Sequence, residues 1–178
     1  MAKEYFVVTI VGPDQRGLVA RITDKISALD ANIEESHMSR LGGEFAVMML
    51  LSLSNDDTQK LLAGLERLNS DEVRVFVKGT DLARLKVFEG FVPYEVSVIG
   101  ADHEGIVHQV AEYLAKLRCQ IDDMETHVTR APVTGTPLFS MRAEIIAPPR
   151  ISLPQLRDEL EELGDQLGVD IDVNLLAD

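Results

Sequence analysis

The chain of 178 residues carries 17 Lys and Arg against 30 Asp and Glu, a formal net charge of −13. Hydrophobic residues make up 46% and charged residues 26%, which is typical of one large globular domain or two small ones. The sequence contains no apolar run long enough to span a bilayer, no predicted signal peptide, and a single cysteine, which excludes a disulfide framework. These features predict a cytoplasmic protein without a membrane segment.

The acidic charge lies mostly in the second half of the chain. Residues 1–88 have a net charge of −2, and residues 89–178 have a net charge of −11. Because DNA binding depends on clustered Lys and Arg that release counterions from phosphate, direct nucleic-acid binding is disfavoured. A basic protein partner would be attracted to the second half.

The first strand and helix are predicted by residues 5–29. Residues 5–11 are rich in Val, Ile and aromatic side chains and predict a strand. Residues 12–17 contain Pro and Gly and predict a turn. Apolar residues then recur at helical spacing, which places on one helical face Leu18, Ile22, Ile26 and Leu29.

Residues 32–79 predict the rest of a compact unit. Two strands, 32–40 and 44–53, flank a Gly-Gly turn, which is typical of a hairpin. A second helix and a last strand, residues 73–77, follow, and the helix is marked by Leu61, Leu65 and Leu68. The order βαββαβ is that of the ferredoxin-like unit.

The second half repeats this pattern at a shift of 88 residues, with a six-residue insertion before Phe139. In its last helix, Ser152 and Gln155 predict a capping box. The sequence therefore predicts an α+β fold with two ferredoxin-like (βαββαβ) units and antiparallel sheets. The predicted boundaries are 1–80 for the first domain, 81–92 for a linker and 93–178 for the second domain. The aligned motifs are Val8-x-Ile10-Val11-Gly12-x-Asp14-x-x-Gly17-Leu18 and Val96-x-Val98-Ile99-Gly100-x-Asp102-x-x-Gly105-Ile106.

The two predicted sheets differ in the polarity of their outer faces. Residues 139–145 alternate apolar and polar side chains, as in a strand with one solvated face. Residues 45–51 contain no polar side chain, which predicts a first sheet covered on both faces. Two segments could pack on the outer face of the first sheet: the same sheet of a second copy in a homodimer, or the linker 81–92. The polar outer face of the second sheet would pack poorly against it.

The loops between the first strand and helix of each copy, 12–17 and 100–105, are the main candidate binding sites. Free N–H groups follow Gly17 at the helix start and could accept an anion such as a carboxylate. Asp14 could accept a hydrogen bond from an ammonium group, and Asn32 offers both an acceptor and donors. An Asp before a helix is also a common N-cap, so ligand binding and capping are both open.

Other reactive side chains do not form a catalytic or metal-binding pattern. The loops lack the P-loop and dinucleotide-binding motifs, and Cys119 is an expected core position with no base beside it. The acidic pairs 34–35 and 122–123 fit a solvated strand edge or a paired-carboxylate site. We therefore predict no enzyme activity, no catalytic residue, no metal site and no cofactor. The scattered histidines, which lack paired cysteines, are His37, His103, His108 and His127.

The motif of the first copy resembles an ACT domain. The resemblance is carried by residues 8–19, by Asn32-Ile33 and by Gly43-Glu44-Phe45-Ala46. The doubled arrangement resembles the family of glycine cleavage system transcriptional repressors. The second copy departs from the pattern at Gln120, where Asn is favoured, and by its insertion at 128–137.

The resemblance implies an amino-acid-sensing regulatory protein that acts through contact with a regulator protein rather than with DNA. We also expect a homo-oligomer, because the strand at 45–51 is apolar on both sides. ACT domains typically bind an amino acid between domains, with the first loop of one and a strand edge of another. The family name suggests glycine as the ligand. The implied ligand-binding residues are Asp14, Gly17, Leu18 and Asn32, with Asp102, Gly105, Ile106 and Gln120 as a second set.

Two other interpretations stay open. The chain could be a stand-alone regulatory subunit of an amino-acid metabolic enzyme, or a purely structural dimerisation module. The repeat also resembles the regulatory part of phosphoserine phosphatases and formyltetrahydrofolate deformylases, but those enzymes need a further catalytic domain.

Overall fold

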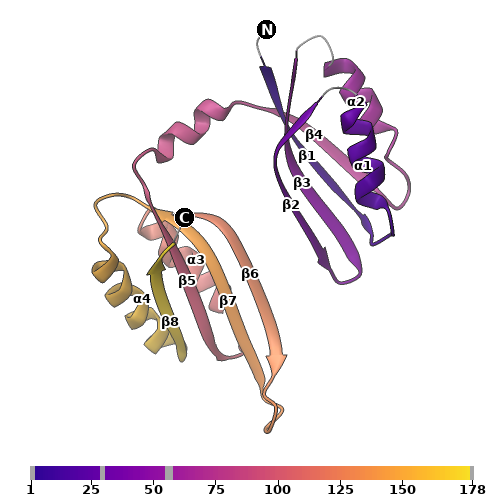
Figure 1. Cartoon of the computed structure of the whole chain (residues 1–178). Coiled ribbons are helices and arrows are strands. Elements are labelled where there is room, and N and C mark those ends of the chain that lie inside the picture. Colours follow the sequence, from indigo (N-terminus) through magenta and orange to yellow (C-terminus); the bar gives the residue numbers. More distant parts are fainter. Residues whose placement is uncertain (1–2, 29–30, 55–57, 177–178) are drawn as a thin grey trace. The chain divides into compact units, whose positions relative to one another are not determined.

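The computed structural model describes residues 3–28, 31–54 and 58–176 and shows two compact units, Met1–Arg84 and Leu85–Asp178 (Figure 1). The division falls inside the segment predicted as a linker, where the chain forms a short 3-10 helix, η2 (Leu82–Phe88). The boundaries 1–80, 81–92 and 93–178 stay a prediction. Within the described residues, no helix is both long and apolar enough to cross a membrane.

The first unit is a four-stranded antiparallel sheet with two helices on one face (Figure 1). Its strand order is β2-β3-β1-β4, so β2 and β4 are the edges. The predicted α+β fold and βαββαβ order are confirmed. The elements are β1 (Lys3–Pro13), α1 (Leu18–Ser27), β2 (Asn32–Leu41), β3 (Glu44–Ser54), α2 (Thr58–Glu66) and β4 (Arg74–Thr80).

The second unit has the same topology, with strand order β6-β7-β5-β8. Its second helix is longer than that of the first unit, 15 residues against 9. The elements are β5 (Val92–Ala101), α3 (Ile106–Lys116), β6 (Gln120–Arg130), β7 (Pro137–Ala147), α4 (Leu153–Leu167) and β8 (Val169–Leu175).

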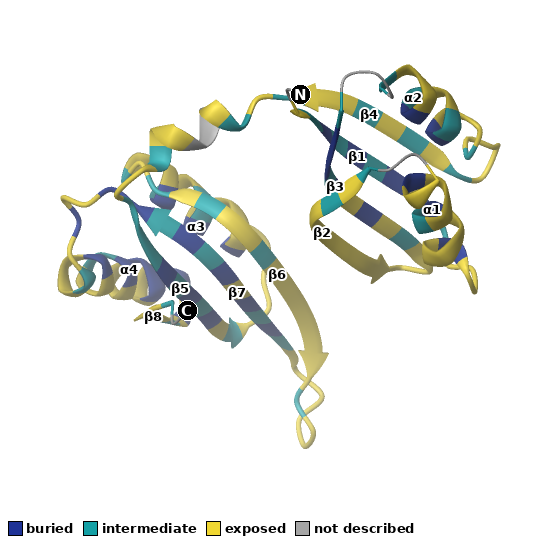
Figure 2. Cartoon of the chain, turned by 45° about the horizontal axis from the view of Figure 1, so that its top comes forward, coloured by how far each residue is buried: buried dark blue, intermediate teal, exposed yellow. Residues whose placement is uncertain are grey.

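The helices bury the apolar faces that the sequence predicts, seen as dark bands turned toward the sheets in Figure 2. In α1, Leu18, Ile22 and Ile26 are buried in the core of the first unit, while Leu29 lies outside the described residues. In α4, the Ser152 hydroxyl accepts the Gln155 N–H, as predicted. The Gln155 side chain does not return to Ser152 but donates to Glu159, so half of the predicted capping box forms.

The segment predicted as a turn begins later than expected. Strand β1 continues to Pro13, and Gly12 pairs with Phe45 inside the sheet. A Cβ atom at Gly12 would lie 2.9 Å from Val73 Cγ2, and one at Gly100 would lie 2.6 Å from Val169 Cγ1. The repeated glycine is thus required by close packing against the residue before β4 and the first residue of β8, not by a turn.

Candidate functional site

The loop between β1 and α1 is held by backbone hydrogen bonds. The Asp14 N–H donates to Gly43 O at 3.1 Å, which ties the loop to the β2–β3 hairpin. The Leu18 N–H donates to Gln15 O at 3.1 Å and closes a turn. The Leu18 N–H is therefore already used. A ligand would meet the other N–H groups of the first helical turn, which lack intrahelical partners.

The capping interpretation of Asp14 is wrong. The N-cap of α1 is Gly17, whose φ of 79° lies in the left-handed region, and its helix start has no side-chain cap. Gly105 takes the same place before α3, with φ 95°. Such φ values favour glycine over residues with a Cβ, which explains why both copies carry it. The carboxylates of Asp14 and Asp102 are therefore not needed to begin the helices.

Each unit has a hollow at this loop. The hollow of the first unit has a volume of about 100 Å³, and that of the second about 500 Å³. All six lining positions of the first hollow have a corresponding lining position in the second, so the shared fold places corresponding residues around both. The first is lined by Asp14, Gln15, Gly17, Leu18, Val19 and Phe45, and the second by Asp102, His103, Gly105, Ile106, Val107, His108, Val128 and Phe139.

Asp14 is paired with a cation that the sequence did not single out. Arg40 Nη1, near the end of β2, lies 3.2 Å from Asp14 Oδ2, and the Arg40 side chain is 70% exposed against 39% for Asp14. An exposed pair of this kind contributes about 0–1 kcal/mol to stability. The rim of the hollow thus carries an acceptor and a donor of opposite charge. Arg40 reaches Asp14 because β2 pairs with β3 and β3 pairs with β1, and local sequence spacing gives no sign of such pairing.

Asn32 and Gln120 do not line these hollows. Asn32 pairs with Ser52, and Ser52 pairs with Tyr5 near the start of β1, whereas Asp14 follows the end of that strand. Eight residues of extended chain, about 26 Å, separate the two levels. Gln120 is placed in the same way, opposite Ile146 in β7. Within one unit, therefore, Asp14 and Asn32 cannot contact one small ligand.

Asn32 belongs to another polar cluster, at the start of β2. The Glu34 carboxylate accepts a hydrogen bond from the buried Ser52 hydroxyl and pairs with Lys3 Nζ at 3.5 Å. Hydrogen bonds from Ser52 and then Asn32 lower the pKa of the Glu34 carboxyl below its usual value. The next residue, Glu35, instead bonds His37 at 3.1 Å. Glu34 and Glu35 are therefore separately engaged rather than a joint carboxylate site.

In the second unit, His103 occupies the position of Gln15. Its Nε2 lies 2.8 Å from Leu167 O at the end of α4, and its Nδ1 lies 3.1 Å from Glu104 O. A neutral imidazole has one N–H, so both bonds form only in the protonated ring. The carbonyls of Glu104 and Leu167 accordingly raise the pKa of His103 above its usual value.

We expect His103→Gln to make the stability of the second unit less dependent on pH. Because the folded-state pKa is raised, the contribution of His103 is fully present below the unfolded pKa of about 6.5 and is lost as pH rises through the folded value. Thermal unfolding of both proteins from pH 5.5 to 8.5 should show a difference that shrinks with pH. The exposed His127→Gln serves as control, and parallel curves for parent and His103→Gln would contradict this role.

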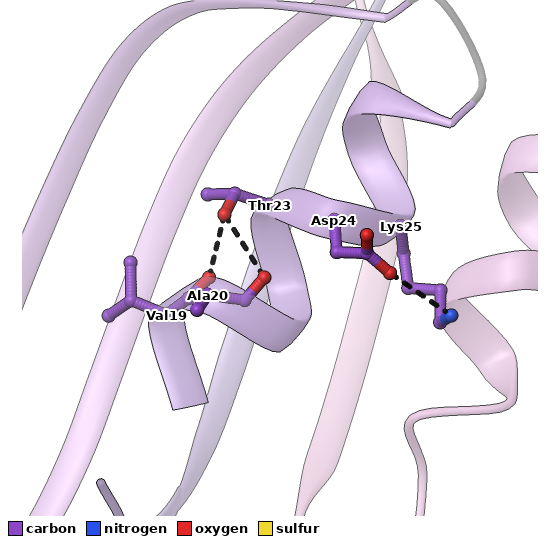
Figure 3. A network of polar contacts seen from close by, with 5 residues as sticks. All are labelled: Val19, Ala20, Thr23, Asp24 and Lys25. Carbon is purple, nitrogen blue, oxygen red and sulfur yellow. Dashed lines mark hydrogen bonds and ion pairs between the residues drawn. The ribbon is translucent and has the colours of Figure 1, made fainter. Parts of the chain in front are cut away.

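The polar side chains farther along α1 are satisfied within the helix (Figure 3). Thr23 Oγ1 donates to the carbonyls of Val19 and Ala20, at 3.0 and 3.2 Å. Lys25 Nζ pairs with Asp24 Oδ2 at 3.4 Å.

Cys119 and the histidines do not form a reactive site within the described ranges. Burial, and then the charge of Glu159, raise the pKa of the Cys119 thiol to about 11, so it stays protonated at neutral pH. A protonated thiol is a poor nucleophile. No group of three or more metal-ligating side chains occurs among the residues with described positions.

Comparison with known proteins identifies the first unit directly. Residues 4–77 match the model of the ACT domain. Over 61 residues the chain is 39% identical to the UPF0237 protein YjhC of Lactococcus lactis. The aligned segment covers 34% of this chain and 70% of that protein. Over 51 residues it is 43% identical to the glycine cleavage system transcriptional repressor of Escherichia coli. That aligned segment covers 29% of this chain and 27% of that protein.

The tandem arrangement also has a solved counterpart. The crystal structure of an unknown protein from Galdieria sulphuraria superimposes with a TM-score of 0.83 at 30% identity. The match covers 99% of this chain and 100% of that one, so both units are included. The topology of both sheets, the family match and these relatives lead to one conclusion: residues 4–77 belong to the ACT domain family, and the chain contains two ferredoxin-like units.

Proposed function

We propose that this protein is an amino-acid-sensing regulatory protein that acts through protein–protein contact. The observation that carries the proposal is the recurrence of one hollow in both units, with corresponding residues around it. The E. coli relative is named a transcriptional repressor, although the chain spans about a quarter of its length. Regulation of the glycine cleavage system, with glycine as effector, is carried over from that likeness.

At the first hollow the amino acid is proposed to bind through its two charges. Its ammonium group meets the Asp14 carboxylate, and its carboxylate meets Arg40 and the free N–H groups at the start of α1. The ion pair between Asp14 and Arg40, at 3.2 Å, supports this arrangement because the two partners present opposite charges at one rim. Charge-assisted hydrogen bonds of this kind are the stronger ones in proteins.

Asn32 is proposed to complete the site from a second copy. β2 is an edge strand, and an antiparallel pair of two such edges sets the start of one strand beside the end of the other. Asn32 of one copy would then approach Arg40 and Asp14 of the other. This agrees with the shared site that the family resemblance implies, and it accounts for the distance between Asn32 and Asp14 within one unit.

Contact with protein rather than with DNA is supported by the second sheet. Its outer face carries one cation, Arg142, which Glu95 holds at 2.6 Å. The carboxylates that share this face by strand register would repel DNA phosphate and attract a basic protein. They are Glu95, Asp123, Glu125, Glu144, Asp170 and Asp172.

A thermal-shift screen of the twenty amino acids tests the sensing role. A ligand at about a hundred times its dissociation constant stabilises its site by about 2.7 kcal/mol. We expect one small amino acid to raise the melting temperature of the first unit by several degrees. If none of the twenty changes either transition, the protein is a structural module. If one amino acid does bind, co-purification with a regulator protein or with an amino-acid enzyme identifies the class of the target.

A further inference from the structure

The outer face of the first sheet, opposite its helices, is partly exposed and has a mainly apolar centre on β1 and β3, with mostly polar side chains on the edge strands. Strand pairing places on this face three rows of side chains that cross all four strands. Met48 is 52% exposed and Phe76 64% exposed, while the linker residue Val87 is 72% exposed. The rows are Lys78–Val7–Leu50–Glu35, Phe76–Thr9–Met48–His37 and Arg74–Val11–Ala46–Ser39.

The second unit shows that the fold does not require an apolar outer face. By the repeat alignment, Met48 corresponds to Arg142 and Phe76 to Asp172. The strand at 139–145 buries its apolar side chains and turns polar ones outward, as predicted. The two sheets therefore share one topology and a buried inner face but differ in the polarity of the outer face. The apolar face needs an explanation other than the stability of the unit, and contiguous exposed apolar surface commonly marks an interface.

We propose that this face is the contact between two copies of the chain, related by a two-fold axis parallel to the strands. Such an axis exchanges the two sheet edges and keeps each row at its own level. Each row then lies over itself in reverse order. Lys78 meets the Glu35 of the second copy, Val7 meets Leu50, and Thr9 meets Met48. The amino-acid site does not enter this argument. The contact differs from the β2 edge pairing proposed for Asn32, so a chain that uses both contacts forms an assembly larger than a dimer.

The charges distinguish this axis from its alternative. A two-fold axis across the strands would keep each strand over itself and reverse the rows, which sets Lys78 over Arg74 of the second copy. Like charges at a contact are unfavourable, whereas the parallel axis forms two pairs between Lys78 and Glu35. Large residues also oppose small ones, with Met48 over Thr9 and Val11 over Ala46. Sheets packed face to face keep their strands within about 30°, so the rows stay opposed near the centre.

The size of the face sets the expected strength. Four strands about 4.8 Å apart and seven residues about 3.3 Å long give a flat footprint on the order of 400 Å² per copy. Counted over both copies this is about 800 Å², below the roughly 1,200–2,000 Å² of stable interfaces and in the range of weak, transient ones. We therefore expect a dimer that dissociates on dilution, and sedimentation velocity of the full chain from about 1 to 100 µM covers the range in which such small interfaces dissociate.

Phe76→Asp tests the surface. The second unit carries Asp172 at the corresponding position, so the sheet can accommodate this side chain. The variant should raise the dimer dissociation constant by at least about tenfold, because it removes a large exposed apolar side chain from the contact and adds a carboxylate that must lose its water. The matched control is Ile99→Asp on the outer face of the second sheet, where Ile99 is 59% exposed, and it should leave association unchanged. A monomeric parent, or equal effects of both variants, would overturn the proposal.

A charge exchange tests the axis. Lys78→Glu and Glu35→Lys should each weaken the dimer by about threefold to tenfold, and the double variant should restore it. Both side chains are exposed, so folding should be retained, which circular dichroism checks. The axis across the strands predicts the opposite sign, since Lys78→Glu would then face Arg74. A dimer strengthened by Lys78→Glu, or a double variant as weak as the singles, would contradict the parallel axis.

Discussion

Replacing Gly100 by Ala is expected to lower the free energy of unfolding of the second unit by about 2–3 kcal/mol. The added Cβ would lie 2.6 Å from Val169 Cγ1 and 2.9 Å from its Cβ, inside the range that real contacts avoid. Strand β5 pairs with β8 at this point, so neither backbone can withdraw without losing hydrogen bonds. For a unit of this size the melting temperature should fall by roughly 10–20 °C, measured by calorimetry.

Gly79 provides a matched control for this substitution. It also lies in a strand, β4, but a Cβ there would meet only Phe6 Cε1, at 3.7 Å. Ala at this position should be neutral or stabilise by up to about 1 kcal/mol, because it restricts the unfolded chain. Combining Gly100→Ala with Val169→Ala should cost less than the sum of the two single changes. Equal costs for Gly79→Ala and Gly100→Ala would show that packing at Val169 does not require the glycine.

The fold could be predicted because its signals are local and occur twice. The apolar spacing of α1 recurs in α3, and strands rich in β-branched residues precede both helices, so each copy supports the interpretation of the other. The capping hydroxyl of Ser152 was also predictable, since an N-cap needs contacts over three residues alone.

The glycines of the loop show the limit of local reasoning. Gly17 marks the turn correctly, but Gly12 and Pro13 belong to the strand. The reason for a glycine there is the side chain of Val73, which is distant in sequence. Asp14 similarly has the residue type and position of an N-cap, yet the left-handed Gly17 takes that place and Asp14 pairs with Arg40. Contacts made across the sheet decide both cases.

The candidate site was predictable in part for the same reason. The lining residues Asp14, Gly17 and Leu18 are neighbours in sequence and lie around one hollow. Asn32 follows the helix in the chain, and an α-helix antiparallel to β1 returns it to the opposite end of the sheet. Its association with Asp14 therefore requires a second copy, a relation that a single sequence does not reveal.

Asp14→Asn is expected to weaken binding of the amino acid by about 10- to 100-fold, because hydrogen bonds to charged groups contribute about 1.5–3 kcal/mol. Since Asp14 caps no helix and its ion pair with Arg40 is partly exposed to solvent, the free energy of unfolding should change by less than about 1 kcal/mol. Asp14→Ala should behave in the same way, with lost affinity and retained stability. Titration calorimetry gives the first quantity and thermal unfolding the second.

Asp102→Asn is the matched variant of the second unit and shows which of the two hollows binds the amino acid. If the first hollow alone binds, Asp102→Asn leaves the affinity unchanged, whereas two working sites halve the stoichiometry in each variant. Asn32→Ala adds the test of a shared site, because Asn32 can reach the ligand only from another copy. Its loss of affinity should match that of Asp14→Asn in direction, although the two residues lie at opposite ends of one sheet. An Asp14→Asn protein that binds its amino acid as tightly as the parent would place the ligand away from this loop, because no other carboxylate lines the first hollow among the described residues.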